Sequence, residues 1–382
     1  MNTKIKDNII PGLSAFTALF PLSLAMGVCS GFGIYSGIVS LVISSLLAAF
    51  IRSPVFFAPS YLIFLLFTFT GAFCGNGLAF FSLFFASVAA FFISFVPENV
   101  LKKYLIPSAV AGISIASAFA MTAMKTTDYF GIGASGKDVI GILHDYVSLG
   151  FHANWRGVLY GTITLVIMIT FPRKFKKGYK KFSPAMWSLL ITTVLNFFLN
   201  PDKNTTAIPE TGDYPVNIAS IFSNAFFKDI TPSGISFAVA SAVSLALIIS
   251  YASLSLGRKE RLLSPLASFV SSMFGGLPST ATDLPSSGVL SGVSCAVLSL
   301  TAFLVPRFFI SRIPTATLAV ILIVTAWQAV DWHEIKLSFT SGSGALILFI
   351  VSVVLTVAVS LPYAVFAVFT LSVLYKTLLK KE

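Results

Sequence analysis

The residues of this sequence that could bind a small ion gather in the stretch GGLPSTATDLPSSGVLSG, from Gly275 to Gly292. It holds four glycines, two prolines, one carboxylate and several Ser and Thr, yet it separates two strongly apolar runs. A second interruption, IRSPVFFAPSYLIF, lies at Ile51–Phe64. A helix that begins inside a membrane leaves its first N–H groups unpaired and carries a partial positive charge at that end. Two such ends facing each other therefore predict an anion site.

In this interpretation, Pro59 and Ser60 lie in the first turn of one half-helix, while Thr280 and Thr282 cap the other. The alternative is a re-entrant turn with satisfied caps and no ligand. Both interpretations require apolar elements that cross a bilayer on either side of each interruption.

The composition indicates such elements. Hydrophobic residues make up 56% of the 382-residue chain and charged residues 10%, whereas a soluble domain carries roughly 25% charge. Apolar stretches of about 18–22 residues recur along the chain, and each is long enough to cross a bilayer. They lack the alternation of a membrane β-barrel. The sequence therefore predicts an all-α polytopic membrane protein with the lipid bilayer as a partner.

Hydropathy predicts about 14 transmembrane spans. They cover residues 9–29, 32–51, 58–73, 77–96, 105–124, 156–172, 183–199, 234–256, 262–275, 280–286, 288–306, 314–330, 343–360 and 362–377. With an even number of spans, 18 of the 25 Lys and Arg lie on one side. Basic residues concentrate on the cytoplasmic side, so we expect both termini in the cytoplasm and the protein in the plasma (inner) membrane. The net charge of +11 therefore does not indicate a nucleic-acid partner.

A predicted extracytoplasmic loop at 200–232 divides the chain into two repeats of seven spans, at 1–199 and 233–382. The third segment of each half is short and is preceded by Pro and by Gly or Ser. Short, interrupted segments at matching positions of two halves indicate the binding site of a transporter.

Four stretches resemble the SulP family of inorganic anion transporters, in the family's order. IPGLSAFTALFPLSLAMGVCSGFGIYSGIV, at 10–39, is similar to its Pro-containing first span and Gly-Tyr-rich second span. APSYL, at Ala58–Leu62, resembles the third-span motif, and FGGLPSTA, at Phe274–Ala281, resembles the start of the tenth span. IPTATLAVILIVTAWQAVDW, at Ile313–Trp332, is similar to the twelfth span.

The resemblance implies an inverted repeat of seven plus seven spans, with half-helices in spans 3 and 10. A core domain of spans 1–4 and 8–11 would face a gate domain of spans 5–7 and 12–14. A homodimer is a further expectation from the family. The implied substrate-binding residues are Phe20, Ser23, Ala58, Pro59, Ser60, Tyr61, Ser279, Thr280, Ala281 and Thr282.

Three features depart from the family pattern. The eighth-span region SYASLSLG has Tyr251 and no carboxylate, and Pro285 lies near the point where many members have an Arg. The chain also stops at Glu382 without the STAS domain usual in the family, so we expect a short form.

Asp283 is the one carboxylate placed within the predicted core-domain spans. Three roles remain open for it. It could complement a helix dipole, couple proton movement to anion movement, or bind Na⁺.

No arrangement of Ser, His, Asp or Cys suggests catalysis, a metal site or a cofactor. GIGASGKD, at Gly131–Asp138, matches G-x-G-x-x-G but lacks the strand–helix context and the final Ser or Thr of a phosphate loop. We expect a secondary active transporter of small inorganic anions, sulfate-like or bicarbonate-like, that moves core against gate as an elevator with H⁺ or Na⁺ as the coupling ion. The alternatives are a permease like the nucleobase–cation symporters and a non-transporting membrane protein of the same fold.

Overall fold

The computed structural model of the chain describes residues 3–104, 106–131, 139–148, 153–174, 182–199, 231–254, 257–304 and 310–378. The predicted loop at 200–232 lies outside the described residues except at its end, and so does most of the GIGASGKD stretch.

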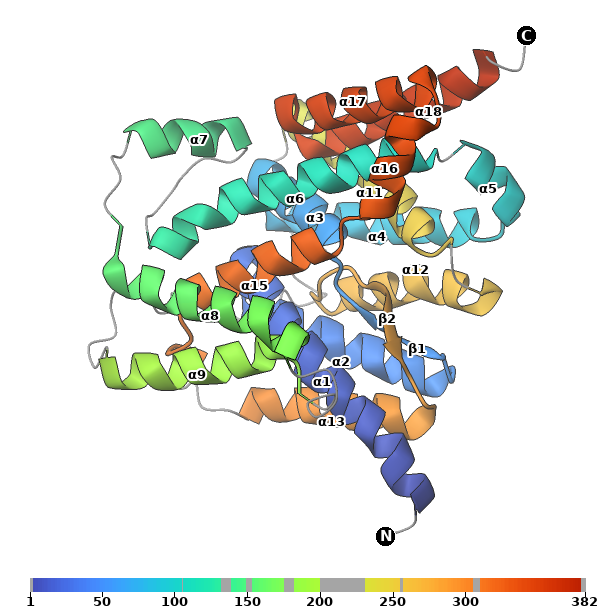
Figure 1. The fold of residues 1–382 in the computed structure, drawn as a ribbon. Helices are drawn as coiled ribbons and strands as arrows, with labels where there is room; N and C mark the ends of the chain where they lie inside the picture. Colours follow the sequence, from blue (N-terminus) through green and yellow to red (C-terminus); the bar gives the residue numbers. More distant parts are fainter. Residues whose placement is uncertain are drawn as a thin grey trace.

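Figure 1 shows the helices as a bundle in which most run roughly along one direction. The first half of the chain contains α1 (Thr3–Cys29), α2 (Ile34–Phe50), β1 (Val55–Ala58), α3 (Tyr61–Cys74), α4 (Asn76–Ile93), α5 (Glu98–Tyr104), α6 (Pro107–Phe130), α7 (Val139–Ser148), α8 (Trp155–Lys174) and α9 (Pro184–Leu199). The second half contains α11 (Pro232–Ala252), α12 (Arg258–Met273), β2 (Thr280–Pro285), α13 (Val289–Leu304), α15 (Thr315–Gln328), α16 (Trp332–Thr340), α17 (Ser343–Ala358) and α18 (Leu361–Leu378).

The helices confirm a largely helical membrane protein. Every predicted span except 280–286 coincides with one helix, and the short helices α5, α7 and α16 are additional. Four helices are long and apolar enough to cross a membrane, at Ile9–Cys29, Asn76–Ile93, Pro107–Phe130 and Pro232–Ala252. A bent pair, α15 with α16, passes the same test at an angle of 41°.

Helix α3 is too short to cross a bilayer alone. Its 14 residues cover about 21 Å, whereas the hydrocarbon layer is about 30 Å thick. The four residues of β1 precede it and add about 13 Å at the rise of a strand. Together, the strand and the short helix therefore have the length that a membrane crossing needs.

The prediction of a half-helix at 280–286 is wrong, because Thr280–Pro285 forms strand β2. Thr is β-branched and favours a strand, and Pro285 cannot donate a hydrogen bond within a helix. Gly288 has a φ of 114°, which ends the extended run just before α13 begins at Val289. Only residues 286–288 separate the strand from α13, so no half-helix lies between them.

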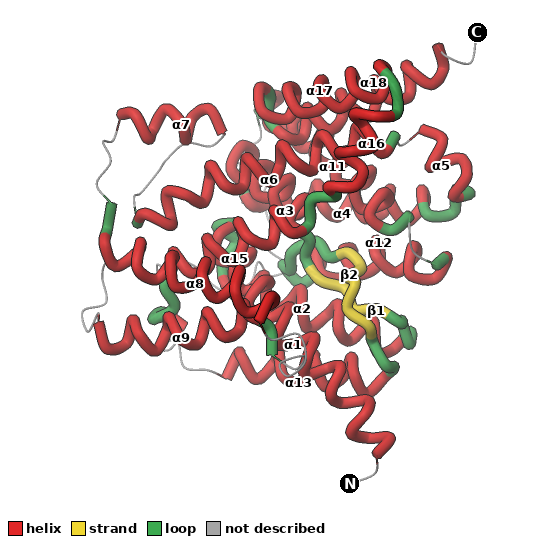
Figure 2. Tube along the Cα trace, viewed as in Figure 1, coloured by secondary structure: helices red, strands yellow, loops and turns green. Residues whose placement is uncertain are grey.

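The two strands form one antiparallel pair, with one strand from each half of the chain (Figure 2). The register pairs Val55 with Pro285, Phe57 with Ala281, and Ala58 with Thr280. Two steps along β1 thus match four steps along β2, so β2 contains a bulge centred on Asp283. Bulges redirect side chains and are common beside functional sites.

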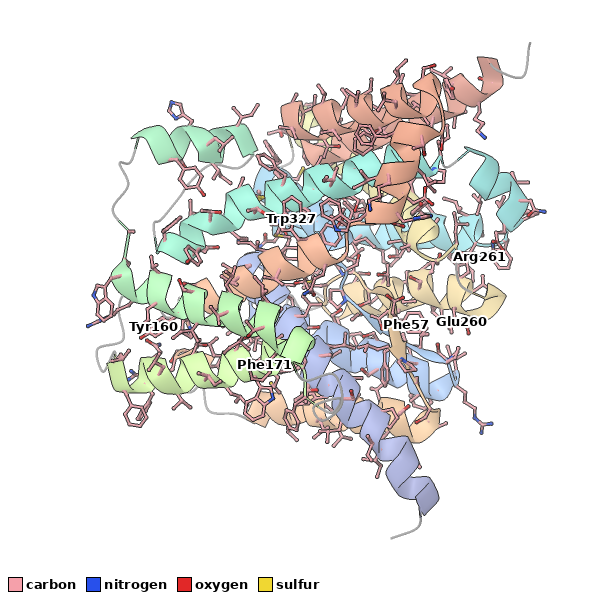
Figure 3. All side chains as sticks on the ribbon, viewed as in Figure 1. Phe57, Tyr160, Phe171, Glu260, Arg261 and Trp327 are labelled. Atoms are coloured by element: carbon pink, nitrogen blue, oxygen red, sulfur yellow. The ribbon has the colours of Figure 1, made fainter. Side chains whose placement is uncertain are left out.

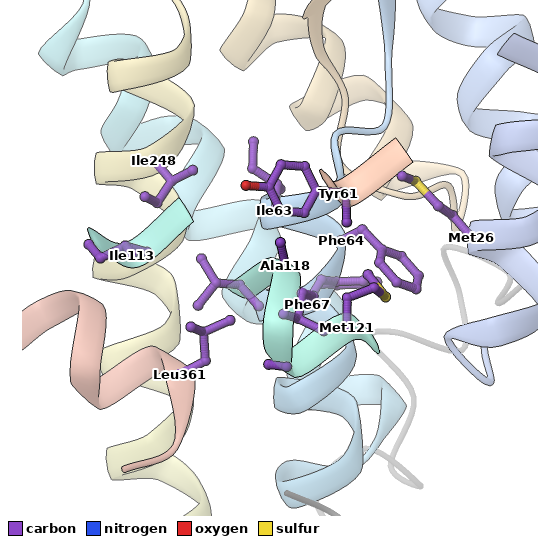
Figure 4. Close-up of a cluster of buried hydrophobic side chains, with 14 of the residues drawn as sticks. Met26, Tyr61, Ile63, Phe64, Phe67, Ile113, Ala118, Met121, Ile248 and Leu361 are labelled. Atoms are coloured by element: carbon purple, nitrogen blue, oxygen red, sulfur yellow. The ribbon is translucent and has the colours of Figure 1, made fainter. Parts of the chain in front are cut away.

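The main apolar core surrounds α3. Ile63, Phe64 and Phe67 are fully buried there, and they meet Met26 from α1 and Met121 from α6 (Figure 4). The burial of nine of the first ten residues of α3 fixes the position of its N-terminus relative to the strand pair.

Candidate functional site

The N-terminus of α3 begins where β1 ends, near the centre of the bundle (Figure 2). Ser60 is the N-cap residue, with an extended φ of −97° and ψ of 149°, and its side chain makes no capping hydrogen bond. The amide of Phe64 donates to the Ser60 carbonyl at 2.8 Å. The amides of residues 61–63 therefore have no acceptor within the helix, and they face the region that precedes it. The predicted placement of Pro59 and Ser60 in the first turn is wrong by two residues, because the helix starts at Tyr61.

The segment that contains β2 runs along the whole of α2. The amide of Leu277 donates to the backbone carbonyl of Ser36, in the first turn of α2, at 3.3 Å. At the other end, the amide of Ser286 donates to the backbone carbonyl of Pro54, beyond the last turn of α2, at 2.7 Å. The extended segment therefore covers the same depth as a complete helix, and it occupies the place predicted for the tenth span.

Serine hydroxyls hold this segment on its helical neighbours. Ser268 of α12 donates to the carbonyl of Ser279 at 2.6 Å and accepts from its amide at 3.0 Å. The hydroxyl of Ser279 lies 2.7 Å from the hydroxyl of Ser40, which also donates to Leu277 at 2.8 Å. An extended backbone inside a membrane needs such partners, because lipid offers none.

Thr282 has a structural contact of the same kind, since its hydroxyl donates to the Phe56 carbonyl at 2.9 Å. Thr280 pairs with Ala58, and Ala281 pairs with Phe57. The expectation that Thr280 and Thr282 cap a helix is wrong because both lie within β2. The predicted pair of facing helix N-termini is thus reduced to one, that of α3.

The structure brings α1 to the same place. Phe20 packs against the cluster that contains Phe56 and Ala58, and its ring stacks on Phe16 at 5.0 Å. Ser23, one turn later, is fully buried, and its hydroxyl has no hydrogen-bond partner among the residues that the structure describes. A buried hydroxyl without a partner is costly unless a ligand or water supplies one.

Tyr61 points away from the strand pair, toward α6. Its hydroxyl lies 2.6 Å from the hydroxyl of Ser114 and 3.2 Å from the Ser114 carbonyl. This contact makes Tyr61 a link between α3 and α6, and Ser114 is a residue that the sequence motifs did not identify.

Asp283 lies in the bulge of β2 and is exposed. It is not at a helix N-terminus, so the interpretation that it complements a helix dipole is wrong. A carboxylate is costly in lipid and is placed at membrane depth where it lines water. No group of three or more His, Cys, Asp or Glu within the described part of the chain could hold a metal ion.

Apolar helices in two halves, joined by a strand pair beside one helix N-terminus, define a polytopic integral membrane protein. No family model matches the chain. The bicarbonate transporter BicA of Picosynechococcus sp. is 26% identical over 402 residues, which cover 94% of this chain and 68% of BicA. YvdB of Bacillus subtilis, whose name provisionally assigns it to sulfate transport, is 26% identical over 194 residues, or 46% of this chain and 37% of YvdB.

Solved structures agree in fold. The transmembrane domain of BicA has a TM-score of 0.72 at 20% identity and covers 98% of this chain and 97% of that one. SLC26A9 has a TM-score of 0.78 at 15% identity and covers 97% of this chain, which spans 65% of SLC26A9. The resemblance found in the motifs is confirmed: the homologues of this chain are transporters of the SulP/SLC26 family, not enzymes.

Proposed function

We propose that this chain is a secondary active transporter of small inorganic anions, in the sulfate or bicarbonate class. The observation that carries the proposal is the N-terminus of α3, whose first amides have no acceptor within the helix. Helix N-termini bind anions through such amides and through the helix dipole. The names of BicA and YvdB support the same substrate class.

In the proposed site, the anion lies between the N-terminus of α3 and α1. The hydroxyls of Ser23 and Ser60 and the amides of residues 61–63 donate to it, Phe20 and Ala58 form its apolar wall, and Thr280 borders it from β2. Ser279 and Thr282 act through the strand that they hold in place.

The proposed movement is that of a core domain against a gate domain, in an inverted repeat of seven plus seven elements. The packing supports this division: α1–α4 and α11–α13 contact mainly one another, as do α6, α8, α9, α15 and α17. The antiparallel pairing of β1 with β2 supports the repeat, because equivalent segments related by a two-fold axis run in opposite directions. Cytoplasmic termini, the plasma (inner) membrane and a homodimer belong to the same proposal.

Asp283 is proposed as the coupling residue, with H⁺ ahead of Na⁺. Its exposure within a membrane-crossing segment supports a position in a water-filled passage. A carboxylate there could carry a proton alongside the anion.

The test is uptake into liposomes of radiolabelled sulfate, bicarbonate and uracil, measured side by side with the purified protein. We expect sulfate or bicarbonate to accumulate, and Ser23→Ala to lower that uptake. Ser117→Ala is the matched control, because Ser117 is an equally buried hydroxyl without a described partner, on α6. Uptake of uracil alone would favour the nucleobase permease, and uptake of none of the three would favour a non-transporting protein.

A further inference from the structure

A cavity of about 500 Å³ lies between α4, α5, α11 and α18, away from the strand pair. Its wall is almost entirely apolar, with Ile93, Leu101, Leu247, Phe366, Phe369 and Val373 as principal residues. This volume is within the range of pockets that enclose small organic ligands, roughly 300–1,000 Å³. Phe366 and Leu374 are 43% and 56% exposed, so the cavity opens beside α18 toward the surroundings of the protein.

The cavity offers nothing to an inorganic anion. Its two hydroxyls, of Ser250 and Thr370, donate to carbonyls of their own helices, Ala246 and Ala367, each at 2.7 Å. A wall without free donors favours an alkyl chain, and burial of each CH₂ group contributes about 0.8 kcal/mol.

A buried Arg lies close in space to one residue that neighbours this apolar wall. Arg261, at the N-terminal end of α12, is 8% exposed, and its Nε and Nη1 atoms have no hydrogen-bond partner in the described ranges (Figure 3). Its carbonyl accepts from the hydroxyl of Ser94 at 3.0 Å, and Ser94 follows Ile93 of the cavity wall. The backbone of Arg261 therefore lies beside the end of α4 that contributes Ile93 to the cavity wall, within the reach of a side chain of this length.

The neighbouring acid does not neutralise Arg261. The carboxylate of Glu260 lies against the backbone of Gly257 instead. A Cβ atom added to Gly257 would lie 2.5 Å from Oε2 of Glu260. The ion pair between side chains in the described part of the chain is Lys125–Asp128, so Glu260 and Arg261 do not form one with each other. A buried guanidinium with unsatisfied N–H donors is costly, and carboxylate and phosphate are the anions that pair best with it. Of these two groups, the phosphate is the one that the phospholipids of a bilayer supply.

We propose that this cavity binds an anionic glycerophospholipid from the surrounding bilayer. One acyl chain fills the apolar cavity, and the phosphate receives a charge-assisted hydrogen bond from the guanidinium of Arg261. The lipid then lies between α4 and α11 on one side and α18 on the other. This site is separate from the proposed anion site and does not depend on transport.

The test is native mass spectrometry of the detergent-purified protein, incubated with phosphatidylglycerol or phosphatidylcholine that have identical acyl chains. We expect phosphatidylglycerol to be retained under conditions that remove phosphatidylcholine. Arg261→Gln should reduce that preference about tenfold, as expected for the loss of a charge-assisted hydrogen bond. Arg52→Gln, an exposed Arg at the end of α2, is the matched control and should leave the preference unchanged.

Thr370→Trp tests the cavity independently of Arg261, because Thr370 is exposed and its replacement fills the cavity without disturbing the core. We expect it to reduce the binding of both lipids, whereas Val354→Trp, on the exposed face of α17, should not. Equal retention of the two lipids by the parent protein would overturn the role of Arg261. Unchanged binding by Thr370→Trp would overturn the cavity as the site, as would a change of oligomeric mass in that variant, which would indicate a subunit interface.

Discussion

The ammonium group of Lys125 on α6 donates to the carbonyl oxygen of Cys29, the last residue of α1, at 3.1 Å. The same Nζ atom lies 3.1 Å from Oδ2 of Asp128. Lys125 is 8% exposed, whereas the side chain of Asp128 is 36% exposed, so solvent reaches the ion pair from the side of the carboxylate. The carbonyl at the end of a helix carries partial negative charge, which a cation stabilises. Lys125 therefore ties the end of α1 to α6, across the boundary between the two proposed domains.

Replacement of this cation should loosen that boundary. We expect Lys125→Met to lower the free energy of unfolding by about 1.5–3 kcal/mol, the contribution of a hydrogen bond to a charged group. Thermal unfolding in detergent measures the change. Asp128→Asn, which keeps the bond to Cys29, should cost less. An equal loss in both variants would place the stabilisation in the ion pair within α6 instead.

Ser268 should contribute strongly to the stability of the protein, because its hydroxyl bonds to both backbone groups of Ser279, the residue before β2. In Ser268→Ala, both the amide and the carbonyl of Ser279 lose their partner, and each unsatisfied group costs about 1–3 kcal/mol. We expect a clear drop in the unfolding temperature. Ser299→Ala is the control, because Ser299 is also buried but bonds only to Cys295 in its own helix. Similar temperatures for the two variants would contradict the anchoring role of Ser268.

Asp283→Asn should flatten the pH dependence of anion uptake if Asp283 carries the coupled proton. The carboxamide does not titrate, so uptake would no longer rise on acidification, while substrate binding persists. Initial rates in liposomes between pH 5 and pH 8 measure this, with Glu334→Gln, on α16, as a control outside β2. A parent-like pH profile would exclude Asp283 from proton coupling, and a loss of Na⁺ dependence would instead identify it as a cation ligand.

The distribution of Lys and Arg predicts that Lys381 and the 200–232 loop lie on opposite sides of the membrane. After replacement of Cys29, Cys74 and Cys295, a single cysteine at each position should react differently with an impermeant reagent. We expect labelling from outside only in the loop. Labelling of both positions from outside would contradict cytoplasmic termini.

Much of the helical fold could be predicted from the sequence, because long apolar runs have few alternatives in a bilayer. The strands could not, since a short Pro-flanked segment such as VFFAP or TATDLP fits a half-helix or a strand equally well. The partner decides between them, and Thr280 finds its partner at Ala58, far away in the sequence. The residues around Thr280 alone do not show that its pairing partner is Ala58.

The role of the candidate site stays a prediction, but the positions of its residues can be compared with the motifs. The motifs named Phe20, Ala58 and Thr280 as site residues; in the structure Phe20 packs against the cluster that contains Ala58, and Ala58 pairs with Thr280. They did not identify Ser40, Ser114 or Ser268, because serine is common in membrane helices. One signal was present: Ser36, Ser40 and Ser44 are spaced by four residues and so lie on one face of α2. Such a stripe indicates a polar neighbour along the helix.

The extended crossing beside α2 also constrains how the protein is made. A strand of six residues cannot enter a bilayer as an independent unit, because its backbone groups would have no partners there. Those partners, on β1 and α2, are synthesised more than two hundred residues earlier. The first half of the nascent chain must therefore be inserted and folded in the membrane before residues 277–286 can pair with β1 and pack against α2. Ribosomes stalled before this segment would therefore hold a membrane-inserted intermediate in which β1 is not yet paired with β2. Ribosomes stalled after it would hold a chain in which the pair can form.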